Sequence, residues 1–137
     1  MAEIKIKTIL SPAEAIFKEK RSKFFAFAYP VENEAEIKEK IAFLKKNFHD
    51  ARHHCYAYIL GVNKAIYRMN DDGEPSGTAG RPIHGQLLSK DVTNVLVVVV
   101  RYFGGVKLGT GGLRVAYKLA AKEVLENAII IEKNVIF

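Results

Sequence analysis

The sequence has few cysteines, which stabilise very small secreted proteins, and no long apolar run that could insert into a membrane. Of its 137 residues only Cys55 is a cysteine, and one cysteine cannot form a disulfide within the chain. This usage is typical of a reducing compartment, so we expect a cytoplasmic location. The longest uninterrupted apolar run, residues 95–100, is far shorter than the ~20 residues that cross a bilayer. We therefore expect no contact with a membrane.

Other signals are missing as well. The first ten residues alternate charged and apolar side chains, and without a continuous hydrophobic segment they do not resemble a secretory signal. We find no internal repeat, linker or low-complexity tract. A chain of this length has the usual size of one domain and buries about two-thirds of its unfolded surface. Residues 1–137 are therefore expected to form a single domain that needs no disulfide or metal for its stability.

Acidic residues are scarce in one part of the chain. The net charge is +6, and residues 76–118 contribute most of it because they contain six basic residues and a single acidic one, Asp91. The basic residues are Arg81, Lys90, Arg101, Lys107, Arg114 and Lys118. Such a cluster fits an anionic partner, and the alternative is a basic face that only keeps the protein in solution.

Glycines and basic residues alternate in the segment RYFGGVKLGTGGLRVAY, residues 101–117. The segment lies between the apolar run and a predicted long helix, which we expect Thr110 to cap. A strand that leads through glycines into a helix leaves backbone N–H groups without partners, and these groups attract anions together with the helix dipole. Glycine also lets a phosphate approach the backbone closely. The segment therefore predicts an anion site, although its spacing differs from that of a P-loop.

Hydrophobic periodicity predicts the other elements. Residues 3–10, 13–18, 22–31, 51–60, 64–70, 91–101 and 128–137 have the pattern of strands. In the strand 22–31, Phe24 and Phe25 begin two sets of apolar side chains that lie on opposite faces. This pattern suggests that other elements cover both faces of the strand. Apolar residues from Ile37 to Phe48 recur at helical spacing after Asn33, a predicted N-cap, and indicate an amphipathic helix that lies on the sheet.

Two adjacent histidines precede Cys55 in the strand 51–60. Successive side chains of a strand point to opposite faces, so His53 and His54 cannot readily bind one metal ion. For the same reason we interpret Cys55 as a buried structural thiol and not as the partner of His54 in a thiol–imidazole pair. We find no complete catalytic constellation, and we expect neither a metal nor a cofactor.

The segment DDGEPSGTAGRP, residues 71–82, is the longest irregular stretch. Loops of this composition carry function more often than they pack. Its carboxylates allow two interpretations: they bind Mg²⁺ beside a phosphate, or they cap backbone amides and pair with Arg68 or Arg81. Ser76 or Thr78 is expected to cap a short helix that reaches Leu88. We predict that this loop borders the cleft that holds the anion site of residues 101–117 and supplies its second face, formed by Asp71, Asp72, Glu74, Ser76, Thr78 and His54.

Three blocks in this order resemble the Impact/YigZ family. They are HHCYAY at residues 53–58, RMNDDGEPSGTAGRPI at residues 68–83 and VVVVRYFGGVKLGTGGLRVAY at residues 97–117. The resemblance implies a two-layer α+β sandwich, a mixed sheet with helices packed on one face, as in domain IV of elongation factor G. In bacterial relatives a ferredoxin-like domain usually follows, and we expect no such C-terminal domain here.

The last block departs from the family pattern at one position. Relatives commonly read GGLVRAY, whereas this chain reads GGLRVAY. Arg114 therefore sits one residue earlier, which turns its side chain by about 100° around the helix. Thr110, Gly111 and Gly112 match the family pattern without such a shift.

The resemblance also implies a link to translation, and we derive three hypotheses. The first is a module that binds RNA or a ribosome-associated factor, with Lys107 and Arg101 beside an anion cradle at Thr110. The second is an enzyme that acts on a phosphorylated small molecule or nucleotide. The third is a protein-interaction regulator of a translation-factor kinase pathway, as in eukaryotic relatives. The predicted phosphate-binding residues are Arg81, Arg101, Gly104, Gly105, Lys107, Gly109, Thr110, Gly111, Gly112 and Arg114.

Overall fold

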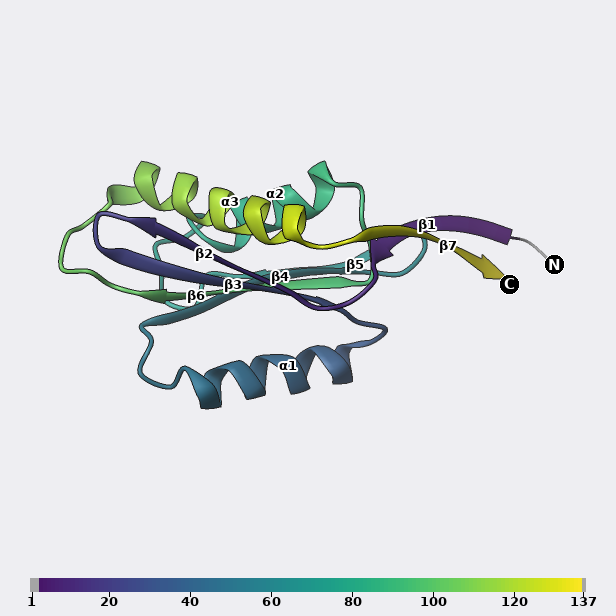
Figure 1. Cartoon of the computed structure of the whole chain (residues 1–137), viewed down its shortest axis with the longest axis horizontal. Coiled ribbons are helices and arrows are strands. Elements are labelled where there is room, and N and C mark those ends of the chain that lie inside the picture. The colour runs from purple at the N-terminus through teal and green to yellow at the C-terminus, as the bar shows by residue number, and fades with distance from the viewer. Residues whose placement is uncertain (1–2, 137) are drawn as a thin grey trace.

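The computed structural model describes residues 3–136, and its centre is an antiparallel sheet of five strands (Figure 1). The strand order is β2-β3-β6-β4-β5. The strands are β2 (Ala13–Glu19), β3 (Ser22–Pro30), β4 (His53–Leu60), β5 (Ile66–Asn70) and β6 (Val95–Tyr102). β6 is the middle strand, and its residues Val95 to Val100 are fully buried, as the continuous apolar run predicted.

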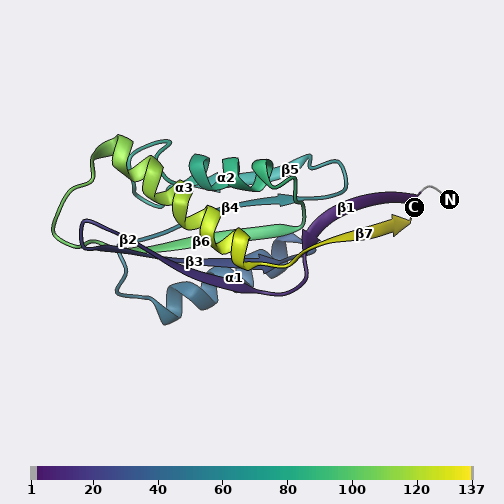
Figure 2. The ribbon, with the colours of Figure 1, turned by 45° about the horizontal axis from the view of Figure 1, so that its top comes forward.

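Three helices cover the sheet, and they lie on both faces. α2 (Gly80–Ser89) and α3 (Gly109–Asn127) pack on one face, and α1 (Glu34–Asn47) packs on the other (Figures 1 and 2). The α+β class was predicted correctly. The expectation of a mixed sheet with helices on one face is corrected, because all strand pairings described for the sheet are antiparallel and α1 covers the second face.

The alternation of side chains in the central strands explains why both faces need cover. Phe24, Ala26 and Ala28 of β3 belong to the core beneath α2 and α3. Phe27 belongs to the core beneath α1, which includes Leu44 of that helix, and Phe25 packs against this second core. Apolar side chains on both faces of β3 therefore require a helix on each side.

The α1 helix starts as predicted. The Oδ1 of Asn33 accepts a hydrogen bond from the amide of Glu36 at 2.9 Å, and the Glu36 carboxylate accepts one from the amide of Glu32 at 3.0 Å. These bonds satisfy donors at the helix start that would otherwise lack partners. None of the helices within residues 3–136 combines the length and apolar character needed to cross a bilayer.

The first and last strands form a separate ribbon. β1 (Glu3–Ile9) pairs with β7 (Ile130–Ile136) in an antiparallel arrangement that extends away from the five-stranded sheet (Figure 1). Both were predicted as strands, although the predicted last strand ends at Phe137, which lies outside the described residues. At the opposite end of the molecule, the β2–β3 turn, the end of β6 and the start of α3 lie together (Figures 1 and 2).

Candidate anion-binding site

The start of α3 is open to solvent. α3 begins at Gly109 after Leu108, and among residues 3–136 no side chain caps it. Gly109, Thr110 and Gly111 are exposed, and a Cβ added at Gly109 or Gly111 would meet no atom within 4 Å. The backbone N–H groups of this first turn have no partner within the helix, so they remain available to an anion.

The expectation that Thr110 caps α3 is wrong. Gly109 has a φ of 74°, a conformation that favours glycine, and the helix starts at this residue. Thr110 is therefore already inside the first turn, two residues after the N-cap position at Leu108. The amides at the start of α3 therefore lack the capping oxygen expected from Thr110.

Gly104 has a different role from the glycines at the helix start. A Cβ at this position would lie 2.1 Å from the carbonyl carbon of Arg21, so only glycine allows this close approach of two backbones. The Gly104 amide also donates a hydrogen bond to the Oγ of Ser22 at 3.3 Å. This contact fixes the segment after β6 against the β2–β3 turn. Gly105, with a φ of 86°, faces open space.

One hollow adjoins the start of α3 and a second lies further along this helix, and the loop between β5 and α2 contributes to both. The first, which we call the inner hollow, has a volume of about 410 Å³. Its lining comes from the starts of β4 and α3, the end of β6 and the loop, and consists of Arg52, His53, Glu74, Pro75, Arg101, Phe103, Lys107, Leu108, Gly109, Thr110 and Leu113. It brings Arg101, Lys107, Gly109 and Thr110 of the predicted set together.

The second, which we call the outer hollow, has a volume of about 420 Å³. It is lined by Ser76, Gly77, Arg81, Pro82, Arg114, Val115 and Lys118. Arg114 and Lys118 are four residues apart on α3, so they lie on the same side of the helix. Despite the shift of one position, Arg114 lines a hollow beside α3. We refer to the two hollows together as the groove.

Beneath the inner hollow, Arg101 is engaged with a buried carboxylate. It is only 5% exposed, and its Nη1 donates to both oxygens of Glu74, at 2.8 and 3.0 Å. The Oη of Tyr117 donates to the same carboxylate at 2.5 Å. The Nε of Arg101, which is buried, has no hydrogen-bond partner among residues 3–136. Arg101 thus lines the inner hollow with most of its charge already neutralised.

Asp71 caps α2 from a distance. Its carboxylate accepts hydrogen bonds from the amides of Gly77, Ala79 and Gly80, at 2.9, 3.1 and 2.8 Å. Burial opposes the ionisation of Asp71, but these bonds, with a smaller contribution from Arg81, hold its pKa below the usual value. The expected caps Ser76 and Thr78 do not cap α2, because the helix starts after Ala79.

The remaining groups of the loop are also engaged within the protein. The Oδ2 of Asp72 accepts a hydrogen bond from the amide of His54 at 2.7 Å, and Thr78 donates to the carbonyl of Pro75 at 2.5 Å. Of the two interpretations of the acidic residues, the capping of amides is therefore the one observed for Asp71 and Asp72, and Glu74 pairs with Arg101. Within residues 3–136, no three His, Cys, Asp or Glu side chains are arranged to hold a metal ion.

The histidines point to opposite faces of β4, as predicted, but His53 is the one in the groove. Its Nδ1 donates to the carbonyl of Asp72 at 2.8 Å, and its Nε2 lies 3.4 Å from Glu74 Oε1. His54 lies on the α1 side, where its ring is 2.8 Å from the carbonyl of Phe48. Strand alternation separates the two residues but does not say which face meets the groove.

Cys55 is fully buried, as predicted. Its Sγ lies 3.1 Å from the carbonyl oxygen of Asp71 and 3.4 Å from the Oη of Tyr117. Burial raises the pKa of its thiol far above the usual value, which disfavours the nucleophilic thiolate. Burial likewise raises the pKa of Tyr117. These groups are therefore suited to holding the loop in place.

Comparison with known proteins agrees with the motifs described above. The model of the Impact N-terminal domain matches residues 20–125. The IMPACT family member YvyE of Bacillus subtilis is 42% identical over 114 residues, which cover 83% of this chain and 52% of that protein. YigZ of Escherichia coli is 38% identical over 109 residues, which cover 78% of this chain and 53% of that protein.

A similar fold is present in a solved structure. The crystal structure of a protein described as hypothetical has a TM-score of 0.90 and 33% identity, and the match covers 94% of this chain and 64% of that one. The chain spans about half the length of YvyE and YigZ. Since the family model covers most of the chain, including the groove, the chain belongs to the Impact family.

Proposed function

We propose that this domain binds a phosphate-bearing partner of the translation apparatus, RNA or a ribonucleoprotein, through the groove. The observation that carries the proposal is the uncapped start of α3, whose exposed first turn lines the inner hollow, while later turns of the same helix line the outer hollow. Free backbone amides and the helix dipole hold a phosphate at such a position. The membership in the Impact family, with the link to translation that it implies, supports the choice of partner.

The charges around the groove favour the same kind of ligand. Five basic side chains line it without an acidic group within ion-pair distance among residues 3–136. They are Arg52, Arg81, Lys107, Arg114 and Lys118. Because both hollows lie along α3, cations beside each of them suit a ligand with several phosphates along a backbone.

The hydrogen bonds of the carboxylates near the groove disfavour the enzyme hypothesis. A metal-assisted reaction at a phosphate needs carboxylate oxygens that face the substrate. Asp71 directs its oxygens to the start of α2, and Glu74 directs its own to Arg101 and Tyr117. The groove is thus better suited to binding a phosphate than to transferring one.

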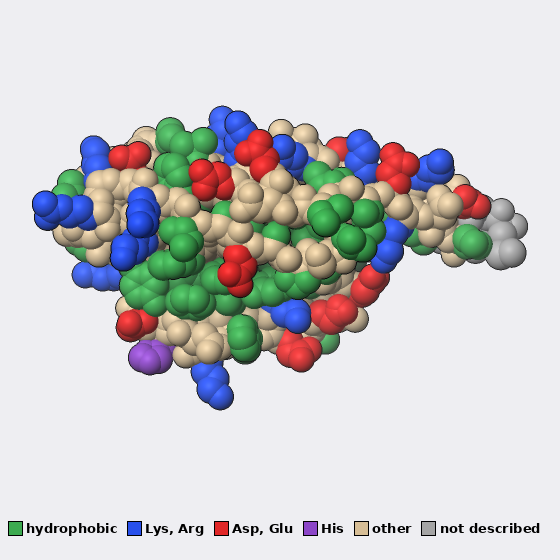
Figure 3. Space-filling view, viewed as in Figure 1, with side chains coloured by type: hydrophobic (Ala, Val, Ile, Leu, Met, Phe, Trp, Pro, Cys, Tyr) green, Lys and Arg blue, Asp and Glu red, His purple; other side chains and the backbone are tan. Residues whose placement is uncertain are grey.

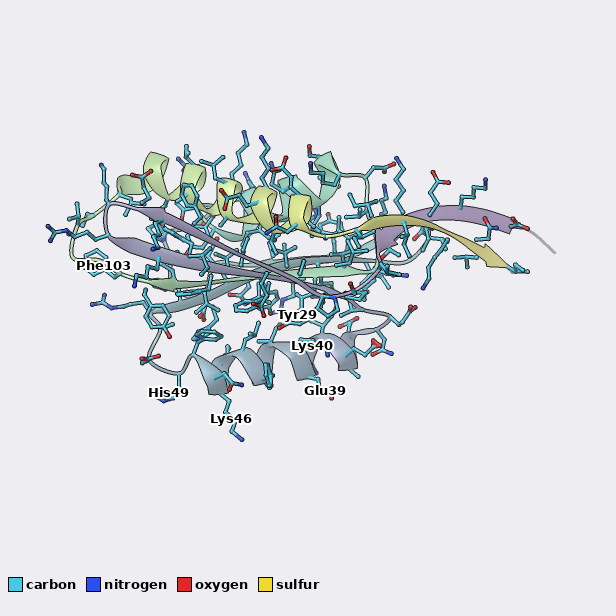
Figure 4. All side chains as sticks on the ribbon, in the orientation of Figure 1. Tyr29, Glu39, Lys40, Lys46, His49 and Phe103 are labelled. Carbon is cyan, nitrogen blue, oxygen red and sulfur yellow. The ribbon has the colours of Figure 1, made fainter. Side chains whose placement is uncertain are left out.

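A titration with labelled RNA tests the proposal. We expect binding whose logarithm falls linearly with the logarithm of salt concentration, because bound cations displace counterions. In the double variant Arg114→Ala/Lys118→Ala, two phosphate contacts are lost, and the slope should decrease by about 1.4. The control Lys38→Ala/Lys46→Ala removes the same charge from α1 on the other face, where Lys46 projects away from the groove (Figure 4), and should change the slope little.

Two results would contradict the proposal. One is the absence of RNA binding at low salt. The other is an equal loss of slope in the α1 control, since this would mean that only the overall charge matters. If the protein instead retains a translation factor after nuclease treatment, a protein partner replaces RNA as the ligand.

A further inference from the structure

A third hollow adjoins the groove, and its lining is aromatic. It has a volume of about 470 Å³ and is lined by Phe25, Phe48, Tyr102, Phe103, Arg21 and Lys23, together with Asp50. We call it the aromatic hollow. Phe103 lines both this hollow and the inner hollow, so one side chain separates them. Phe103 lies at the end of the molecule remote from the β1–β7 ribbon, where apolar side chains are bordered by Lys and Arg (Figures 3 and 4).

The aromatic rings form a fixed surface. The ring of Phe25 stacks on Phe48 with centroids 5.8 Å apart and meets Tyr102 edge-on at 5.7 Å. The Oη of Tyr102 donates a hydrogen bond to Asp50 at 2.7 Å. Phe103, by contrast, is 38% exposed at the border. Several aromatic rings held in place beside an open hollow offer a stacking surface for a planar ligand.

Basic residues surround this surface. The guanidinium of Arg52 lies 5.3 Å from the ring centroid of Phe103, and that of Arg101 lies 5.6 Å from it. Arg21 comes from the β2–β3 turn, which Gly104 holds in place through its contact with the Arg21 backbone. Arg21 adopts a φ of 68°, which is uncommon for a residue other than glycine. The turn therefore presents a cation at a fixed place beside the aromatic rings.

We propose that the aromatic hollow accepts an unpaired base of the strand whose phosphate lies in the inner hollow, so that the ligand is single-stranded nucleic acid. This inference rests on the proposed function and specifies its substrate. In a duplex the bases are stacked within the helix, whereas in a single strand they can turn outward and stack on aromatic side chains. A base next to a phosphate matches an aromatic hollow next to a cationic one.

The charge of the hollow supports this occupant over an apolar protein segment. Arg21, Lys23 and Arg52 attract the phosphates on either side of a stacked base. Asp50 is the one acidic residue in the lining, and its carboxylate already accepts a bond from Tyr102. It offers a further acceptor for an N–H group on a base edge.

The experiment compares three RNA probes of equal length by fluorescence anisotropy: a single strand, the same strand in a duplex, and a single strand with abasic sites. We expect the single strand to bind about tenfold more tightly than the other two, because only it presents bases for stacking. Phe103→Leu should weaken binding of the single strand about five- to tenfold and leave the abasic strand within about twofold. The matched control is Phe43→Leu, which replaces an aromatic residue of α1 that is 59% exposed.

The outcomes separate this inference from the proposed function. If the three probes bind the wild-type protein equally, the base-stacking inference is wrong and the phosphate groove stands. If none binds at low salt, the proposed function fails and the inference fails with it. The comparison of probes uses the unaltered protein, so it remains decisive even if the Phe103 variant does not fold.

Discussion

The α2 and α3 helices start on either side of the same groove, and their first turns differ in one respect. At α2 the carboxylate of Asp71 accepts hydrogen bonds from the amides of Ala79 and Gly80, and from Gly77 before the helix, so the helix start is neutralised from within the protein. At α3 no described side chain takes this place. Every helix start attracts anions. The comparison shows that the groove has one such start already satisfied and one left for a ligand.

Removing the carboxylate that caps α2 should have the largest effect. Asp71→Ala removes the acceptor of three amides, and we expect the free energy of unfolding to fall by about 2–4 kcal/mol in urea titrations. Asp71→Asn retains one oxygen acceptor and should cost less. Inorganic phosphate should then stabilise Asp71→Ala more than the wild-type protein, because α2 has gained an open start. If stability is unchanged, Asp71 is not the cap that the distances indicate.

The Asp71 carboxylate also makes stability depend on pH. Burial opposes its ionisation, but the amide hydrogen bonds prevail and its folded pKa lies below the unfolded value. Its contribution is therefore present above the unfolded pKa, about 3.9, and is lost as pH falls through the lower folded pKa. As pH falls below about 4, the wild-type protein should therefore lose stability that Asp71→Ala does not lose.

Adding a carboxylate at the uncapped start of α3 should have a smaller effect. It should raise the stability of the fold and weaken RNA binding. Thr110→Glu places a carboxylate in the first turn of α3, which should stabilise the fold by about 0.3–1 kcal/mol through the helix dipole. The same charge occupies the anion site and should weaken RNA binding about tenfold, near 1.4 kcal/mol. Thr110→Gln has a similar size without the charge and serves as the control. Unchanged RNA affinity in Thr110→Glu would contradict the site.

The periodicity of the sequence was enough to predict the helices and strands and the faces that they bury. Phe24 and Phe25 lie in opposite cores, and Leu44 of α1 is buried, as the two repeats predicted. The side of the sheet on which α1 packs did not follow from periodicity, because it depends on the route of the chain. The direction of the strand pairs depends on the same long-range connections.

The charges of the site were less predictable, because they depend on partners that are distant in sequence. Arg101 belongs to the predicted basic cluster, yet Glu74, 27 positions earlier, neutralises it. His53 entered the groove in place of His54 because β4 turns that face toward α2 and α3. The cap of α3 was assigned to Thr110 by residue type, whereas the turn at Gly109 decides where the helix begins.

The most direct measurement is a titration of ¹⁵N-labelled protein with inorganic phosphate, followed by NMR. The account predicts that the amide resonances of Gly109, Thr110 and Gly111 shift with phosphate concentration, while those of Ala79 and Gly80 stay in place because Asp71 already occupies them. Unmoved α3 amides, or equal shifts at the two helix starts, would contradict the claim that α3 alone offers an open anion site in this groove.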